Sequence, residues 1–293
     1  MQTDKLLRGY ACTPNGQVHY VEMGEGAPLL LLSESPRTHR QFQRLIPLLA
    51  PYFRVIAIDY PGYGNSDAPP QPVTVHGVTA CVIDFLDALH LERVNVFGIH
   101  TGNKVASCLA ANWPDRVDRV VLAGHTHSII PELEARNAAI QPILDTYLPN
   151  YGENADGSHL VRDWAAAHSN VNNYWWPPKV LFARTVEQSN IEDAENRVID
   201  YLLGWRNTVA MYKAVFAFDL ADAYRRISAP TLVLELLTPQ EAHYGPQAER
   251  ITKIMQHAVA ASIESSYLAG PQEQPVEIAQ EILRFLKEDR NEQ

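Results

Sequence analysis

The segment from Val94 to Lys104 constrains the fold of this chain more than any other. It opens with a short apolar run, Val-Asn-Val-Phe at residues 94–97, which is typical of a buried strand. The chain then reads Gly-Ile-His-Thr-Gly over residues 98–102 and continues into a helix-forming stretch. Glycines two residues either side of a central position predict a sharp turn, because the backbone passing close by excludes a Cβ atom. The central residue, held at the tip of this turn, is His100.

Strands and helices are expected to alternate around this segment. Besides residues 94–99, the apolar patterns predict strands at 17–22, 29–32, 54–59, 117–123, 231–236 and 262–268, and helices around 42–49 and at 75–90, 104–110, 247–256 and 276–286. This order predicts an α/β fold: a mostly parallel, twisted sheet flanked by helices on both faces. A chain of 293 residues is suited to one large core with an insertion.

The alternation stops over residues 128–213, where the pattern is helical and rich in aromatic residues. We expect this stretch to form a helical cap over the carboxyl edge of the sheet, with residues 1–127 and 214–293 forming the core domain. Some of its aromatic side chains are expected to line an apolar substrate pocket, while packing within the cap accounts for at least half of them. These residues are Trp164, Tyr174, Trp175, Trp176 and Trp205.

Four motifs occur in an order that is typical of one superfamily. They are the loop Asp59-x-Pro-Gly-x-Gly-x-Ser-Asp67, the strand-turn-helix around His100, the segment Ala229-Pro-Thr-Leu-Val-Leu234 and the tripeptide Glu273-Gln-Pro275. With them the chain resembles the α/β-hydrolase fold superfamily, in its capped branch of epoxide hydrolases, haloalkane dehalogenases and C–C bond hydrolases. The resemblance covers nearly the whole chain and implies that fold with an inserted helical cap.

The catalytic positions depart from the superfamily pattern. Relatives carry Ser, Asp or Cys at the turn, the nucleophile elbow, where this chain has His100. They also carry an acid beyond the strand near residue 234 and a histidine before the Glu-x-Pro segment, but residues 235–239 contain no Asp and residues 267–271 no His. This chain resembles more closely a smaller branch of the superfamily that has G-x-H-T-G at the elbow and T-P-R-S in the early loop. That resemblance implies no particular activity. An acyl-enzyme on residue 100 is therefore not expected.

The polar residues that remain at the site are suited to proton transfer. His100 would act as general acid and base, since an imidazole titrates near neutral pH. By position, the backbone N–H groups of Thr101 and Ser35 match the oxyanion-hole donors of the superfamily. Glu34 replaces the usual glycine of the early loop and could orient His100, although an exposed loop glutamate is equally compatible. This set is suited to deprotonation beside a carbonyl, decarboxylation, retro-aldol cleavage or activation of a water.

His125 and His127 end the strand at 117–123 and, being two residues apart, are expected to face the same way. Proton relay with His100 is the favoured interpretation. A three-histidine zinc site is the alternative, but nothing else in the sequence calls for a metal, and no cofactor is expected.

Other charged residues have weaker assignments. Asp59 is expected to hold its Pro-Gly-x-Gly turn rather than to act in catalysis. Arg37 and Arg184 could each bind a substrate carboxylate, but surface positions are favoured. Glu241 and His243 could enter the mouth of the site. His39, His90, His168, His243 and His257 show no constellation.

Composition limits the partners. A net charge of −10 argues against binding to nucleic acid or an anionic membrane. Three scattered cysteines and the lack of an apolar leader or membrane-length run predict a cytoplasmic protein. A homodimer is common among relatives.

Two functions stay open: a cofactor-independent hydrolase or lyase acting on a small carbonyl compound through His100, and a hydrolase relative that binds a small ligand without catalysis.

Overall fold

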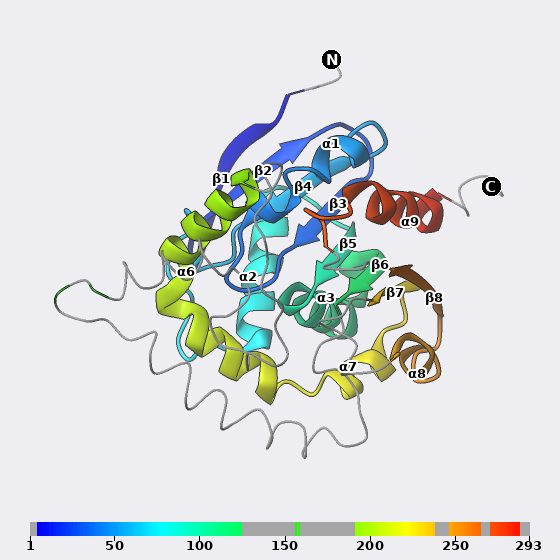
Figure 1. The fold of residues 1–293 in the computed structure, drawn as a ribbon. Helices are drawn as coiled ribbons and strands as arrows, with labels where there is room; N and C mark the ends of the chain where they lie inside the picture. The colour runs from blue at the N-terminus through cyan, green and yellow to red at the C-terminus, as the bar shows by residue number, and fades with distance from the viewer. Residues whose placement is uncertain are drawn as a thin grey trace.

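The computed structural model describes residues 5–124, 156, 158, 191–237, 246–264 and 270–287. Its centre is an eight-stranded sheet with the strand order β1-β2-β4-β3-β5-β6-β7-β8 (Figure 1). The strands β1, β2 and β4 pair antiparallel, and from β4 to β8 all pairings are parallel. The mostly parallel sheet is thereby confirmed. The strands are β1 (Leu7–Thr13), β2 (Gly16–Met23), β3 (Pro28–Leu32), β4 (Arg54–Ile58), β5 (Val94–Ile99), β6 (Val117–Ala123), β7 (Thr231–Leu237) and β8 (Ala258–Glu264).

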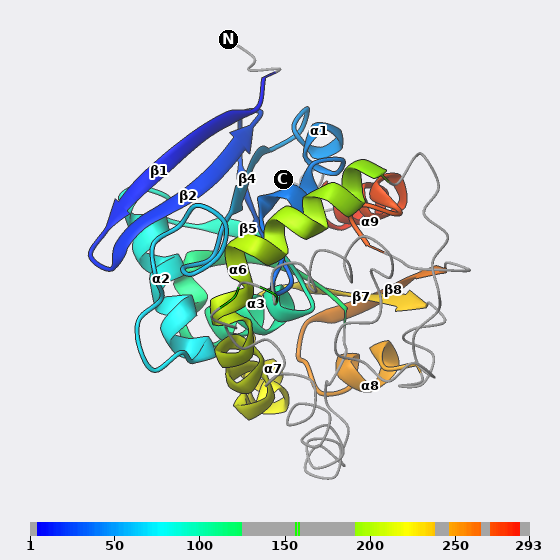
Figure 2. The same cartoon turned by 60° about the vertical axis from the view of Figure 1, so that its left-hand side comes forward.

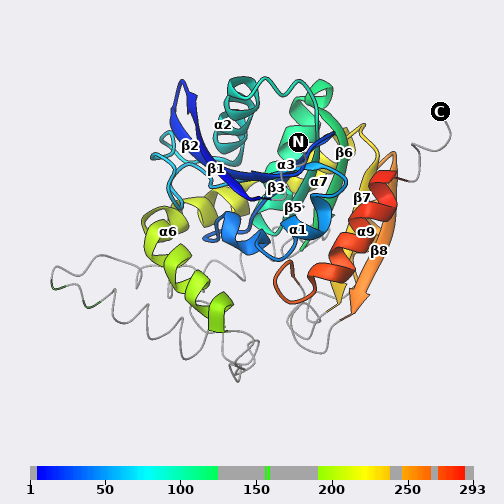
Figure 3. The same cartoon turned by 90° about the horizontal axis from the view of Figure 1, so that it is seen from above.

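Successive side chains of the central strands enter two separate cores, one on each face of the sheet. Along β3, Leu30 and Leu32 join one buried cluster, whereas Leu29 and Leu31 join the other. This period of two, with both faces covered, explains why β3 is a continuous apolar run. The first core is covered by α2 (Val75–Ala88), α3 (Thr101–Asn112), α7 (Leu220–Arg226) and α8 (Ala248–Thr252). The second is covered by α1 (Ile46–Leu49) and α9 (Pro275–Lys287), and Figure 3 shows α2 and α3 on one side of the sheet with α1 and α9 on the other.

The helix α6 (Ile191–Ala217) lies over the loops that follow two central strands (Figure 2). It is bonded to the loop after β3 through Asp200 and to the loop after β4 through Asn207. It continues past residue 213, where the cap was expected to end; residues 128–190 of that expected cap, apart from 156 and 158, lie outside the described residues. No helix in the described part of the chain is both long enough and apolar enough to cross a membrane.

Several elements differ from the sequence-based expectation. β8 begins at Ala258 and not at Ser262, because its backbone pairs with β7 from Thr231↔Ala258 onward. Its first residues are partly or largely exposed, so they lack the apolar pattern from which a buried strand is predicted. The expected helix over 42–49 is instead a 3-10 turn, η1 (His39–Phe42), and a one-turn α1, in which Pro47 lacks the N–H needed inside a longer helix. A second 3-10 turn, η2 (Pro114–Arg116), follows α3. β1 and α7 were not expected.

Candidate active site

Strand register brings Glu34 and His100 together. β3 and β5 are parallel neighbours, with Leu32 paired to Gly98, so their carboxyl ends meet at one edge of the sheet. Glu34 and His100 each lie two residues beyond that pair. The Nε2 atom of His100 is 3.5 Å from the Oε2 atom of Glu34, an ion-pair distance longer than a good hydrogen bond. The two side chains are 24% and 25% exposed, which leaves both accessible to a small molecule.

His100 adopts the backbone conformation expected at the tip of a sharp turn. Its φ of 50° and ψ of −106° lie outside the regions that an L-residue usually occupies. The flanking glycines permit this turn: a Cβ on Gly102 would lie 1.9 Å from the carbonyl oxygen of Leu32, and one on Gly98 would lie 2.3 Å from that of Gly102. Strain of this kind costs about 1–3 kcal/mol and clusters at functional sites.

The imidazole of His100 packs against the backbone of Gly124. β5 pairs with β6 through Ile99↔Ala123, and the N–H of His100 donates to the carbonyl of Ala123 at 3.2 Å. Gly124, the residue that directly follows β6, is therefore the neighbour of His100. A Cβ on Gly124 would lie 2.5 Å from Nδ1 of His100, so the absence of a side chain at this position makes room for the ring.

The electrostatic surroundings favour a neutral imidazole. Partial burial lowers the pKa of His100, Glu34 raises it, and the ammonium group of Lys104 lowers it, with a net decrease from the ordinary value. Lys104 lies one turn into α3 and is only 2% exposed. At neutral pH His100 is thus mainly the free base, which is the form able to accept a proton.

The two expected oxyanion donors flank this pair in the described structure. Thr101 is the first residue of α3, where backbone N–H groups have no partner within the helix. Ser35 follows Glu34; its hydroxyl is bonded to the hydroxyl of Tyr63 at 2.8 Å, and its carbonyl accepts from the hydroxyl of Tyr212 at 3.0 Å. Both residues are buried, and their role as donors stays a prediction.

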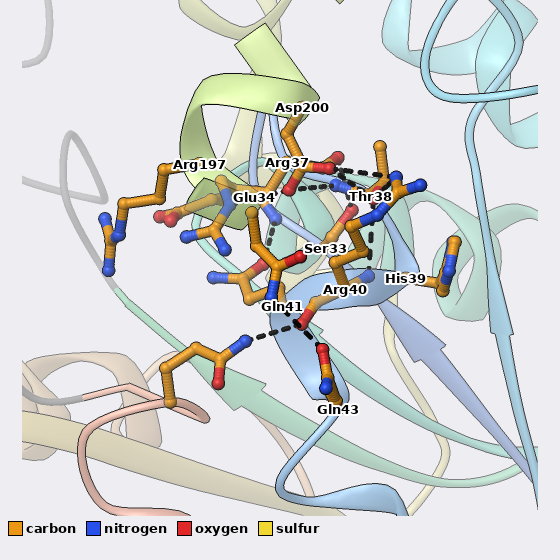
Figure 4. Close-up of polar contacts among 12 residues, drawn as sticks. Ser33, Glu34, Arg37, Thr38, His39, Arg40, Gln41, Gln43, Arg197 and Asp200 are labelled. Carbon is orange, nitrogen blue, oxygen red and sulfur yellow. Dashed lines mark hydrogen bonds and ion pairs between the residues drawn. The ribbon is translucent and has the colours of Figure 1, made fainter. Parts of the chain in front are cut away.

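Arg37 was expected at the surface, and this expectation is wrong. The side chain is 2% exposed, and its Nε donates to Oδ2 of Asp200 on α6 at 2.9 Å (Figure 4). A guanidinium group is costly to bury alone, so the long-range partner Asp200 is what allows the loop to turn this side chain inward. The carboxylate that Arg37 binds is therefore supplied by the protein itself.

His39 was expected to belong to no constellation, and this expectation is also wrong. Asp59 accepts from Nδ1 of His39 at 2.7 Å, from Nδ1 of His19 at 2.9 Å and from the backbone N–H groups of His39 and Asn65. His19, His39 and Asp59 offer three possible metal-ligand atoms within 4.8 Å of one another. However, both oxygens of Asp59 already accept hydrogen bonds, and the donor distances are those of N–H···O contacts, so a structural role fits better than a metal site.

Of the remaining expected site residues, only Trp205 belongs to the described part of the chain. Trp205 is buried on α6 beside the guanidinium of Arg206. The others lie outside the described residues: His125, His127, Trp164, Tyr174, Trp175, Trp176, Arg184, Glu241 and His243.

The sheet order, the strand-turn-helix after β5 and the site at the carboxyl edge define a protein class. Residues 28–234 match the model of the alpha/beta hydrolase fold family, so the chain belongs to that family. Structure comparison agrees: an epoxide hydrolase from Vigna radiata aligns with a TM-score of 0.77 and 17% identity over 97% of this chain and 99% of its own. An enol-lactonase from Burkholderia xenovorans aligns with a TM-score of 0.70 and 21% identity over 95% and 99%. At these identities the likeness shows the fold alone.

Among curated proteins, the chain is similar to several named hydrolases and dehalogenases. It is 33% identical over 117 residues to a soluble epoxide hydrolase of a Corynebacterium species, covering 40% of this chain and 39% of that protein. It is 35% identical over 108 residues to haloalkane dehalogenase 2 of Mycobacterium tuberculosis, covering 36% and 38%. It is 30% identical over 131 residues to (E)-2-((N-methylformamido)methylene)succinate hydrolase of Acinetobacter baylyi, covering 43% and 48%. The match thus spans less than half of each relative.

Proposed function

We propose that this protein is an enzyme in which His100 acts as general acid and base on a small carbonyl-containing organic molecule. The observation that carries the proposal is the pair formed by His100 and Glu34, 3.5 Å apart and partly exposed at the carboxyl edge of the sheet. The reaction is either hydrolysis by an activated water or cleavage of a C–C bond, as in decarboxylation or retro-aldol reactions. The names of the matched relatives support hydrolysis as the broader class.

The proton would move through the imidazole of His100. In its neutral form the ring accepts a proton from a water or from a carbon or hydroxyl group of the substrate, and it returns the proton to the leaving group later in the reaction. Glu34 stabilises the imidazolium that forms in between, because its carboxylate favours the charged ring. Negative charge on a carbonyl oxygen would be accepted by the N–H groups of Thr101 and Ser35.

The sequence of residues 235–239, which contains no Asp where relatives carry their acid, supports a mechanism without a triad. The last residues of β7 contain one carboxylate, that of Glu235. Its Oε1 accepts from the backbone N–H of Gln247, just before α8, so this oxygen is engaged by the segment that leads into α8. Without a nucleophile at residue 100, proton transfer is the chemistry that the described side chains supply.

The test compares purified wild type with His100→Ala and Glu34→Gln. Each protein is incubated with short esters, lactones, β-keto acids and β-diketones, with and without a chelator, and the loss of substrate is followed by mass spectrometry. Tyr52→Phe, a change on an exposed ring, is the control. We expect wild-type turnover that falls at least about 100-fold in His100→Ala, the scale of general-base catalysis, and less in Glu34→Gln.

The products and the chelator decide between mechanisms. Incorporation of the elements of water identifies a hydrolase, and loss of CO₂ or splitting without water identifies a lyase. Turnover that survives in His100→Ala contradicts the proposal. Inhibition by the chelator favours a metal held by His100 with His125 and His127. A ligand that raises the melting temperature of wild type without being converted favours the non-catalytic binder.

A further inference from the structure

The loop after β3 is fastened to α6 by one buried carboxylate. Figure 4 shows Asp200 reaching from α6 to this loop, where its Oδ2 accepts from Nε of Arg37 at 2.9 Å and from the N–H of Thr38 at 3.3 Å. Its Oδ1 accepts from the hydroxyl of Thr38 at 2.6 Å and lies 3.4 Å from Nη1 of Arg40. We call these four residues, Arg37, Thr38, Arg40 and Asp200, the Asp200 clamp.

Burial makes the clamp geometrically demanding. Asp200 is fully buried, and Arg37 and Thr38 are exposed by 2% and 0%. A buried carboxylate is tolerated only while its donors stay within hydrogen-bond distance, because an uncompensated charge in the interior costs several kcal/mol. The loop is thus tied to one position relative to α6, and the hydroxyl of Tyr212, also on α6, makes a second tie to the carbonyl of Ser35.

Arg37 of the clamp and its neighbour Gln41 are hydrogen-bonded to the peptide groups of Glu34. The backbone N–H of Arg37 donates to the carbonyl of Glu34 at 2.8 Å, and the N–H of Glu34 donates to Oε1 of Gln41 at 3.0 Å. The hydroxyl of Ser33 donates to the carbonyl of Arg37 at 3.0 Å, which closes the turn around Glu34. Both ends of Glu34 are therefore fixed by the segment that Asp200 holds.

We infer that Asp200 is a positioning residue: it holds Glu34 against His100 by fixing the loop of residues 33–41 through Arg37 and Thr38. The inference rests on the proposed function in taking the pair of Glu34 and His100 as the reacting pair. It assigns to α6 a role in assembling the site, since the helix supplies the group that sets the place of Glu34. Asp200 itself touches neither His100 nor a reacting atom among the described contacts.

The experiment measures the titration of the His100 imidazole by NMR, and so needs no substrate. The signal is assigned by its loss in His100→Gln. Glu34→Gln gives the reference decrease in the pKa of His100, since it removes the carboxylate that raises this pKa, while Lys104, a second described charged group that acts on the ring, stays in place. The test variant, Arg37→Met/Asp200→Asn, removes the two most buried charges of the clamp together, so the net charge is unchanged. The third charge, that of Arg40, stays, and its side chain is 23% exposed.

Two further variants serve as a milder change to the clamp and as a control outside it. Thr38→Val removes the 2.6 Å hydroxyl contact to Asp200 while keeping all charges. Arg226→Met/Asp222→Asn makes the same substitutions in an exposed ion pair on α7, with side chains 44% and 52% exposed. Folding of every variant is checked by circular dichroism and urea unfolding.

We expect the double clamp variant to lower the pKa of His100 by at least half of the decrease seen in Glu34→Gln, Thr38→Val to lower it by a smaller amount, and the α7 variant to leave it unchanged. Combining the clamp variant with Glu34→Gln should lower the pKa of His100 no further than Glu34→Gln alone, because both variants act through the same contact. An unchanged titration in a folded clamp variant, or full additivity with Glu34→Gln, overturns the inference. Once a substrate is known, the clamp variant should lower kcat at least tenfold with KM within about twofold. A proposed function that fails leaves the NMR result standing, since the titration does not depend on turnover.

Discussion

At the scale of single residues, Gly124 leaves the space that the His100 ring occupies. Its φ of +62° is strained for any L side chain, and an added Cβ would lie 2.5 Å from Nδ1 of His100. We expect Gly124→Ala to lose about 1–2 kcal/mol of stability from the backbone alone, and to reduce His100-dependent turnover because the ring must move. The measurements are urea unfolding and turnover of the substrate found for wild type.

Gly26→Ala separates these two effects. Gly26 also has a positive φ, +100°, but its added Cβ would meet only the carbonyl oxygen of Tyr52, at 3.9 Å. We expect a similar loss of stability without loss of turnover. Equal turnover in the two variants would show that the close contact between Gly124 and the His100 ring does not contribute to activity.

The residue scale also shows what the sequence could reveal about the site. The glycine spacing around His100 is a local signal, and Glu34 is predicted from the resemblance to the superfamily, in which its position lies in the loop after the early strand. Arg37 was misjudged because its partner, Asp200, lies 163 residues away. No local pattern marks such a pair, since a charged side chain turns inward only when the fold brings the opposite charge to it.

At the scale of elements, α7 fastens the helix that follows His100. Tyr224 of α7 is fully buried, and its hydroxyl donates to Oδ1 of Asn103 in α3 at 2.8 Å. The amide group of Asn103 in turn donates to the carbonyl of Ala123 at 3.1 Å. We expect Tyr224→Phe to lower the free energy of unfolding by about 1 kcal/mol, the net contribution of one buried hydrogen bond, because Oδ1 of Asn103 keeps its contact with the hydroxyl of Ser107 at 3.3 Å.

Urea unfolding of Tyr224→Phe checks this, with Tyr52→Phe, at a ring 46% exposed, as the matched control. A loss in the control as large as that in Tyr224→Phe would contradict the assignment. The helix α7 escaped prediction because it has only seven residues, and β1 because only one of its seven residues is buried, so its sequence lacks a clear apolar pattern. The strongly apolar strands β3, β5 and β6 were located within a residue or two, since burial on both faces leaves an unambiguous pattern.

At the scale of the whole molecule, Asp59 connects segments that are far apart in the chain. Its carboxylate joins His19 of β2, His39 of η1 and the backbone of Asn65. His19 and Asp59 meet because β2 and β4 are neighbours in the sheet. The sequence could therefore suggest a structural role for Asp59 from its own loop, but not its histidine partners, which the sheet topology brings to it.

These contacts predict how stability depends on pH. Burial acts to raise the pKa of Asp59, but the hydrogen bonds from His19 and His39 outweigh it, and the net result is a pKa well below the usual range. A carboxyl whose folded pKa lies below its unfolded value of about 3.9 stabilises the fold above that value, and the contribution is lost as the pH falls toward the folded pKa. For Asp59 we expect this contribution to be at least about 2 kcal/mol at pH 7.

Urea unfolding of wild type and Asp59→Asn between pH 7 and pH 3 should give a stability difference that is constant down to about pH 5 and shrinks below it. Asp118→Asn, in an ion pair with side chains 56% and 43% exposed, is the control and should give a small difference throughout, because solvent screens the pair. If the difference between wild type and Asp59→Asn were as large at pH 3 as at pH 7, the carboxylate of Asp59 would not be the charged centre that joins these segments.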